Sequence, residues 1–197
     1  MNLNIYKPIK RKEIETIAEL HYNFMNGTLL QGFGIEFLAD LYEAISECGA
    51  IYVCREKSEI VGFVAGVTDT VMIIKNLASK KLIRIMQHII RGMITNPRVI
   101  MGVIQSVLYH TDDISAELVS IVVSKDHEGR GIGTKLVRRL ITYFGNKKVG
   151  RFKVITDVGN VRANDFYRKL GFRHYKTLRL LDRTLNYYVE DTTGLYE

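Results

Sequence analysis

The sequence predicts a mixed α/β fold in which one β-sheet carries helices on both faces. The first observation is a strand, a glycine-rich turn and a helix in direct succession over residues 117–144. The second is the order of the other elements, because a strand, two helices and two strands come before this unit, and a strand, a helix and two strands come after it. The third is that 197 residues with 47% hydrophobic content suffice for one sizeable core. We therefore expect a single domain over residues 1–197.

The first half of the chain supplies a strand, a helix pair and a hairpin. We expect a strand at 5–9, and a helix at 13–26 that ends at Asn26-Gly27. A loop over 28–34 leads to a second helix at 35–46, whose apolar residues recur on one face. The runs 50–55 and 60–67 are joined by a polar turn, which predicts a β-hairpin. Gly62 and Gly66 in the second run indicate a bulge or a close backbone approach.

The glycine-rich turn has the character of a phosphate site. Gly129, Gly131 and Gly133 follow an apolar strand and precede a helix with apolar residues at helical spacing. Amides of a first helical turn lack helical partners, and glycines let an anion approach them closely. A nucleoside-triphosphate loop would need Gly-Lys-Ser/Thr, and in a dinucleotide loop the third glycine would come one residue later. Taken alone, the turn predicts either a different phosphate-bearing ligand or a purely structural turn.

A second motif lies about thirty residues downstream, between a predicted strand at 152–158 and predicted closing strands at 172–181 and 183–189. Residues 160–172 read NVRANDFYRKLGF, and 161–170 are expected to be a helix. Together with Glu128-Gly129-Arg130-Gly131-Ile132-Gly133, this pattern resembles the GCN5-related N-acetyltransferase (GNAT) family. That family carries Gln/Arg-x-x-Gly-x-Gly/Ala and then Asn-x-x-Ala-x-x-Phe/Leu-Tyr-x-x-x-Gly-Phe. Glu128 departs from the first motif, and an acid beside a diphosphate weakens its binding.

The resemblance implies a GNAT-like, mostly antiparallel sheet that is split between its fourth and fifth strands to admit acetyl-CoA. It implies an acetyl-CoA-dependent enzyme that transfers the acetyl group to a primary amine by direct attack, with no metal. The residues that would bind acetyl-CoA are those of the two motifs and the strand before them: Ile121, Val122, Val123, Glu128, Gly129, Arg130, Gly131, Ile132, Gly133, Thr134, Asn160, Ala163 and Phe166.

Two residues are candidates for the chemistry. Glu117 stands six residues before Val123, where the histone-acetylating branch of the family has its general base; the alternative is a solvent-facing carboxylate at a strand end. Tyr167 stands where the family's tyrosine meets the thioester sulfur, and would protonate the leaving thiolate; the alternative is a core tyrosine. By resemblance, the loop between the first two helices lines the acceptor site, which makes Leu30, Gln31 and Phe33 substrate-binding candidates. Phe33 can equally be a hydrophobic cap.

The family core connects its third and fourth strands tightly, so residues 71–110 are expected to be an insertion. This segment holds six basic residues and no acid. Residues 76–94 predict a helix with one apolar face (Leu82, Ile85, Met86, Ile89, Ile90, Met93) and one basic face (Lys80, Lys81, Arg84, Gln87, His88, Arg91). Residues 99–108 predict a second helix. Packing on the domain with a solvated basic face is favoured over a lid, a homodimer surface or a peripheral membrane contact.

Composition and charge narrow the classes of molecule that are expected to bind this protein. The net charge of +7 and the basic segment favour an anionic small-molecule acceptor, such as an amino sugar or sugar nucleotide, over a polyamine. A protein lysine or N-terminal acceptor, or a non-catalytic acyl-CoA sensor, are the alternatives. Nucleic acid is disfavoured because aromatic and basic residues do not interleave. No run is long enough for a membrane span, Cys48 and Cys54 have no metal spacing, and we expect a cytoplasmic protein with reduced thiols.

Overall fold

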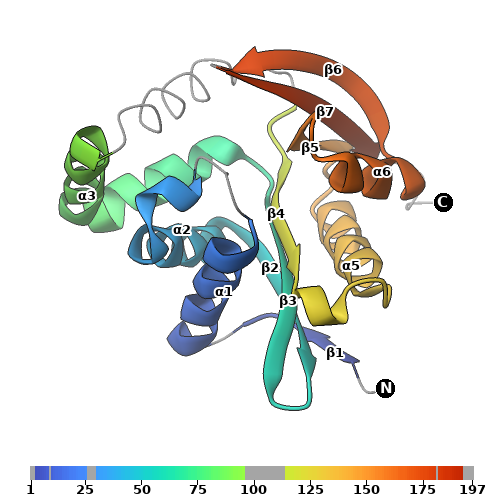
Figure 1. The fold of residues 1–197 in the computed structure, drawn as a ribbon, viewed down its shortest axis with the longest axis horizontal. Coiled ribbons are helices and arrows are strands. Elements are labelled where there is room, and N and C mark those ends of the chain that lie inside the picture. The colour runs from blue at the N-terminus through green and yellow to red at the C-terminus, as the bar shows by residue number, and fades with distance from the viewer. Residues whose placement is uncertain (1–2, 9, 26–29, 96–113, 181, 193–197) are drawn as a thin grey trace.

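A computed structural model describes residues 3–8, 10–25, 30–95, 114–180 and 182–192, and in it seven strands form one sheet (Figure 1). The order across the sheet is β1-β2-β3-β4-β5-β7-β6. All neighbouring strands are antiparallel except β4 and β5, which are parallel. This confirms the predicted mixed, mostly antiparallel sheet. The strands are β1 (Leu3–Tyr6), β2 (Gly49–Glu56), β3 (Glu59–Val67), β4 (Glu117–Val123), β5 (Arg151–Asp157), β6 (Arg173–Leu180) and β7 (Arg183–Asp191).

Helices cover both faces of the sheet, as predicted. Two separate apolar clusters form the core, one between the sheet and α1, α2 and the start of α3, the other between the sheet and α5 and α6. Figure 1 shows these two groups on opposite sides of β4. The helices are α1 (Arg11–Phe24), α2 (Ile35–Cys48), α3 (Thr70–Thr95), α5 (Ile132–Asn146) and α6 (Val161–Lys169), with two short 3₁₀ helices, η1 (Leu30–Phe33) and η2 (Lys125–His127).

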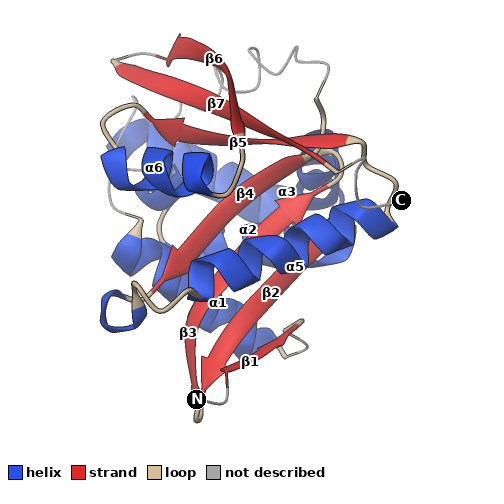
Figure 2. Cartoon of the chain, turned by 90° about the vertical axis from the view of Figure 1, so that its right-hand side faces the viewer, coloured by secondary structure: helices blue, strands red, loops and turns tan. Residues whose placement is uncertain are grey.

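The parallel strands β4 and β5 part soon after they begin. Each has seven residues, but only Glu117 pairs with Lys153 and Leu118 with Val154. Beyond these two pairs the strands diverge, and Figure 2 shows them spreading from a shared start. The predicted split between the fourth and fifth strands is therefore confirmed. It opens toward the carboxyl ends of both strands, which is where ligands bind in α/β sheets.

Two glycines of β3 allow close neighbours: Gly66 allows helix α5 to approach, and Gly62 allows strand β4 to approach. A Cβ on Gly66 would lie 2.8 Å from the Leu140 side chain of α5, and one on Gly62 would lie 2.7 Å from the Val122 carbonyl oxygen. The predicted close approach is therefore present at both glycines. The pairing of β3 with β4 also shifts by one residue at Gly66, which leaves Val119 as a bulge in β4.

The basic helix differs from its prediction in length and in orientation. It begins six residues earlier than expected, at Thr70, and ends at Thr95. Arg84 lies 3.5 Å from the carboxylate of the fully buried Asp40, but its side chain is 47% exposed, as expected for the solvated face. His88, assigned to the same face, is only 12% exposed and lies 3.9 Å from that carboxylate. Ile90, assigned to the packed face, is 53% exposed. The assignment was wrong for His88 and Ile90, because the buried carboxylate of Asp40 favours polar neighbours on the face of α3 that packs on α2, and this requirement outweighs apolar periodicity.

The remaining predicted elements are present with shifted ends. The first strand occupies Leu3–Tyr6 rather than 5–9, because Pro8 has no amide to donate to β2. The second predicted helix of the basic segment, at 99–108, lies outside the described residues. Within the described ranges, no helix is both long and apolar enough to cross a bilayer.

Candidate functional site

A cavity of about 950 Å³ lies where β4 and β5 diverge. All residues predicted to bind acetyl-CoA line it except Arg130, and both predicted catalytic residues, Glu117 and Tyr167, line it as well. Of the three predicted acceptor residues, Leu30 lines the cavity whereas Gln31 and Phe33 do not. The fold therefore brings two distant motifs, and Leu30 from the loop between α1 and α2, to one continuous space.

The glycine turn forms a cradle at the N-terminus of α5. Gly129 and Gly131 have φ angles of +72° and +74°, and a Cβ on either would project into open space. The first i to i−4 bond of α5 runs from the Lys135 amide to the Gly131 carbonyl, so the amides of residues 132–134 have no partner within the helix. Amides, open space and the positive end of the helix dipole suit a diphosphate. The residues present therefore fit the nucleotide part of acetyl-CoA.

The Arg130 side chain holds the glycine turn in place from the side away from the cavity. Its guanidinium makes two hydrogen bonds with the Glu56 carboxylate, at 2.6 and 3.0 Å, and His127 Nε2 lies 3.0 Å from the same group. The hydrogen bonds from Arg130 hold the pKa of Glu56 below its usual range. This clamp ties the glycine turn to the β2–β3 hairpin. Arg130 therefore does not line the cavity, and its side chain is held by Glu56.

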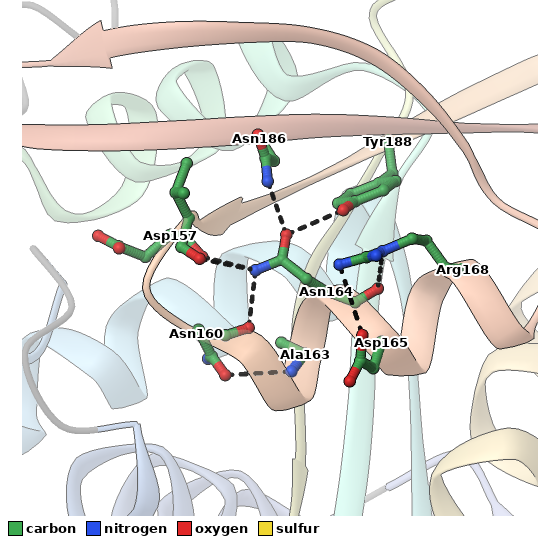
Figure 3. A network of polar contacts seen from close by, with 9 residues as sticks. Asp157, Asn160, Ala163, Asn164, Asp165, Arg168, Asn186 and Tyr188 are labelled. Atoms are coloured by element: carbon green, nitrogen blue, oxygen red, sulfur yellow. Dashed lines mark hydrogen bonds and ion pairs between the residues drawn. The ribbon is translucent and has the colours of Figure 1, made fainter.

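Asn160 and Asn164 fix the opposite wall of the cavity (Figure 3). Asn160 caps α6, because its Oδ1 accepts a hydrogen bond of 3.1 Å from the Ala163 amide. Asn164 is buried, and its Nδ2 donates to the carbonyl oxygens of Asp157 and Asn160 at 2.9 and 2.7 Å. Together these bonds join the start of α6 to the end of β5.

The other end of the Asn164 amide secures α6 to β7. Its Oδ1 accepts hydrogen bonds from Asn186 Nδ2 at 2.8 Å and from the Tyr188 hydroxyl at 2.9 Å. The sequence did not single out Asn164. The available signal was a polar residue on the buried stripe of a helix, three positions before Tyr167, where an amide must find several partners.

Tyr167 lies against the second core cluster and also lines the cavity. It is 5% exposed, and its ring centroid lies 5.4 Å from those of both Phe166 and Phe172. Burial raises the pKa of the Tyr167 phenol above its ordinary value. The group is therefore protonated at neutral pH, which a proton donor requires.

At the end of the cavity near α1, His21 from the last turn of this helix faces Tyr42 of α2. Both side chains are fully buried, and His21 Nδ1 lies 2.5 Å from the Tyr42 hydroxyl. Burial lowers the pKa of His21 to about 4, so the imidazole is neutral at pH 7. The sequence reasoning missed His21, although it stands seven residues after Ile14 on the buried stripe of its helix.

Apolar side chains line the cavity from two elements, and Arg179 and Arg183 line it from the β6–β7 hairpin as well. Leu178, Leu180 and Leu185 line it from the β6–β7 hairpin, and Phe24 and Met25 line it from α1. The other two acceptor candidates turn elsewhere. Gln31 Nε2 donates to the Tyr22 carbonyl oxygen at 2.7 Å, and the Phe33 ring packs 4.5 Å from that of Phe37, as the cap alternative predicts.

Glu117 has a neighbour that complicates its role. The register of β4 and β5 places it opposite Lys153, which is only 2% exposed. Residues opposite each other on adjacent strands project to the same face of a sheet. A buried ammonium group requires a compensating charge, so Glu117 has two candidate roles: general base for the acceptor amine, or counter-charge for Lys153.

We expect Glu117→Gln to lower kcat by about 10²-fold at neutral pH, with a smaller loss at high pH, where the amine loses its proton unaided. Steady-state pH profiles measure this, with thermal unfolding as a control. A pH-independent loss together with a lower Tm would instead identify Glu117 as the counter-charge. In that case, adding Lys153→Met should restore the Tm, because it removes the uncompensated charge.

Known proteins share this fold and part of this sequence. A sequence model of the acetyltransferase (GNAT) family matches residues 15–172. N-alpha-acetyltransferase 30 from Schizosaccharomyces pombe is 33% identical over 61 residues, which are 31% of this chain and 41% of that protein, so the chain spans less than half the length of this relative. The polyamine N-acetyltransferase of Drosophila melanogaster superposes with a TM-score of 0.70 at 13% identity, over 96% of this chain and 100% of that one. The protein yncA from Salmonella typhimurium, solved with its cofactor acetyl-CoA, superposes with a TM-score of 0.64 at 15% identity, over 98% of this chain and 95% of that one. With most of its length matched by the family model, this chain belongs to the GNAT family of acetyltransferases.

Proposed function

We propose that this chain is an acetyl-CoA-dependent N-acetyltransferase that acetylates the primary amine of a small molecule. The observation that carries the proposal is the single cavity at the β4–β5 split, which joins the glycine cradle to Glu117 and Tyr167. A donor can enter from the cradle and an acceptor from the end near His21. Family membership supports the same activity.

The chain's own groups can hold acetyl-CoA along this path. The amides that begin α5 bind the diphosphate. Past Leu118, the edge of β4 that faces β5 has no strand partner among the described residues, so the backbone of residues 119–123 offers donors and acceptors to the amides of the pantetheine arm. Asn160, Ala163 and Phe166 close the other side of the arm.

Transfer then needs two proton movements. The acceptor amine attacks the thioester carbonyl carbon as a neutral nucleophile, and Glu117 takes the proton that the nitrogen loses. Tyr167 gives its phenolic proton to the thiolate that leaves. Both groups line the same cavity as the cradle, so neither needs a metal or a second cofactor in this proposal.

The acceptor end supports an amine that is flanked by an apolar group. Five apolar side chains that line the cavity suit such a flank (Phe24, Met25, Leu178, Leu180 and Leu185), whereas Arg179, which also lines it, suits an anionic substituent. A protein α-amine is the second candidate, because the relative from Schizosaccharomyces pombe is named as an N-alpha-acetyltransferase.

Thiol release from acetyl-CoA tests the proposal, with an alkylamine, an amino sugar, a polyamine and a peptide with a free N-terminus as acceptors. We expect the highest kcat/KM for the alkylamine. A matched peptide with a blocked N-terminus and one lysine separates α-amine from side-chain acetylation. Faster turnover of the free peptide would favour the second candidate. Acetyl-CoA binding without turnover of any amine would indicate a sensor instead.

A further inference from the structure

An ion pair spans the open end of the cavity, and the proposed function gives it no role. Glu128 precedes the glycine turn on the β4 side, and Arg162 lies in the first turn of α6 on the β5 side. Arg162 Nη1 lies 2.5 Å from Glu128 Oε2, and both residues line the cavity. The pair therefore crosses the gap between the two strands beside the cradle.

The pair is built from an exposed cation and a less exposed anion. The Arg162 side chain is 69% exposed and that of Glu128 is 30% exposed. Ion pairs this open to water contribute little net stability, so Arg162 can leave Glu128 at small cost. A diphosphate offers more charge and several acceptor oxygens, and a guanidinium can bind these in a bidentate manner.

Two other arginines near the cavity are held by carboxylates, and a third lies away from the cradle. Arg130 is held by Glu56 behind the turn, and Arg183 Nε donates to Asp157 Oδ2 at 3.0 Å. Arg179 lines the cavity from the β6–β7 hairpin, on the acceptor side. Arg162 is therefore the arginine placed beside the cradle with an exchangeable partner.

We propose that Arg162 is a diphosphate-binding residue that exchanges Glu128 for the diphosphate when acetyl-CoA binds. Glu128 holds the guanidinium at the cleft before binding and competes for it afterwards, which weakens the affinity for the ligand and speeds release of product CoA. This role accounts for an acid at a position where the family has Gln or Arg. The inference rests on the proposed function, because it assumes that the cavity binds CoA.

Calorimetry with CoA and with pantetheine, which lacks the diphosphate, tests this exchange. We expect Arg162→Gln to weaken CoA binding roughly 10- to 100-fold and to leave pantetheine binding unchanged. Glu128→Gln should tighten CoA binding roughly two- to fivefold, and only when Arg162 is present. Arg168→Gln is the matched control, because Arg168 lies on the same helix, is 60% exposed and pairs with Asp165 at 3.4 Å away from the cavity.

Three results would overturn the exchange. The first is wild-type CoA affinity in Arg162→Gln, and the second is equal weakening of CoA and pantetheine, which would indicate a distorted groove. The third is weaker CoA binding in Glu128→Gln, since the pair would then support the site rather than compete with it. If the wild-type chain itself binds no CoA, the proposed function fails, and this outcome is distinct from all three.

Discussion

Replacing Tyr167 with Phe is expected to lower kcat roughly 10- to 10³-fold while leaving the affinity for acetyl-CoA nearly unchanged. The substitution keeps the ring and its contacts with Phe166 and Phe172, and removes only the hydroxyl that would protonate the thiolate. Because burial raises the pKa of this phenol, the donor stays protonated across the neutral range, and the loss should persist from pH 6 to pH 9. Steady-state kinetics and calorimetry measure the two quantities.

Tyr188→Phe is the matched control for this loss. Tyr188 is as deeply buried as Tyr167, but its hydroxyl donates to Asn164 Oδ1 and it does not line the cavity. Removal of the Tyr188 hydroxyl should lower the free energy of unfolding by about 1 kcal/mol and leave kcat near the wild-type value. Among the described residues, the Tyr167 hydroxyl makes no hydrogen bond, so Tyr167→Phe should leave the Tm almost unchanged. Wild-type turnover in Tyr167→Phe would mean that water or the acceptor supplies the proton.

The motifs predicted most of the residues that line the cavity near the cradle, because the requirements of a cradle are local. The cradle needs glycines between a strand and a helix, and the amides follow from that geometry whatever the side chains between them are. Arg130 shows the limit of such reasoning: its motif position placed it near the diphosphate, but its side chain is held by Glu56, seventy-four positions earlier in the chain. A partner so distant leaves no trace in the spacing of either residue.

The part of the cavity near α1 and the β6–β7 hairpin was harder to predict, because it is assembled from side chains far apart in sequence. Leu30 reaches the cavity, whereas Phe33 packs on Phe37, and nothing in the loop sequence separates the two. The predicted faces of the basic helix were partly wrong for the same reason. Its apolar periodicity was visible, but the buried Asp40 on another helix decided that His88 packs inward. A buried carboxylate outweighs apolar periodicity in deciding which face of a helix packs inward. Such a contact can be recognised only when the positions of both helices are known.

Gly131→Glu is expected to remove measurable binding of acetyl-CoA. The Cβ of any residue at this position would project into open space at the N-terminus of α5, where the diphosphate is proposed to lie. A carboxylate about 4 Å from a phosphate charge costs about 4 kcal/mol at an effective dielectric constant of 20, which corresponds to roughly a 10³-fold loss of affinity. Calorimetry with CoA measures the loss. Gly131→Gln separates bulk from charge, because it adds a similar side chain without the repulsion.

Backbone strain is the competing explanation, and Gly171→Glu controls for it. Gly131 and Gly171 have φ angles of +74° and +99°, and a Cβ at either position meets no atom within 4 Å. Both variants therefore force a side chain into the left-handed region, at a similar cost in stability. Gly171 follows α6 and does not line the cavity, so Gly171→Glu should bind CoA as the wild type does. Equal losses in the two variants would attribute the effect to strain. Wild-type affinity in a folded Gly131→Glu would mean that the diphosphate binds elsewhere and that the cradle has been misassigned.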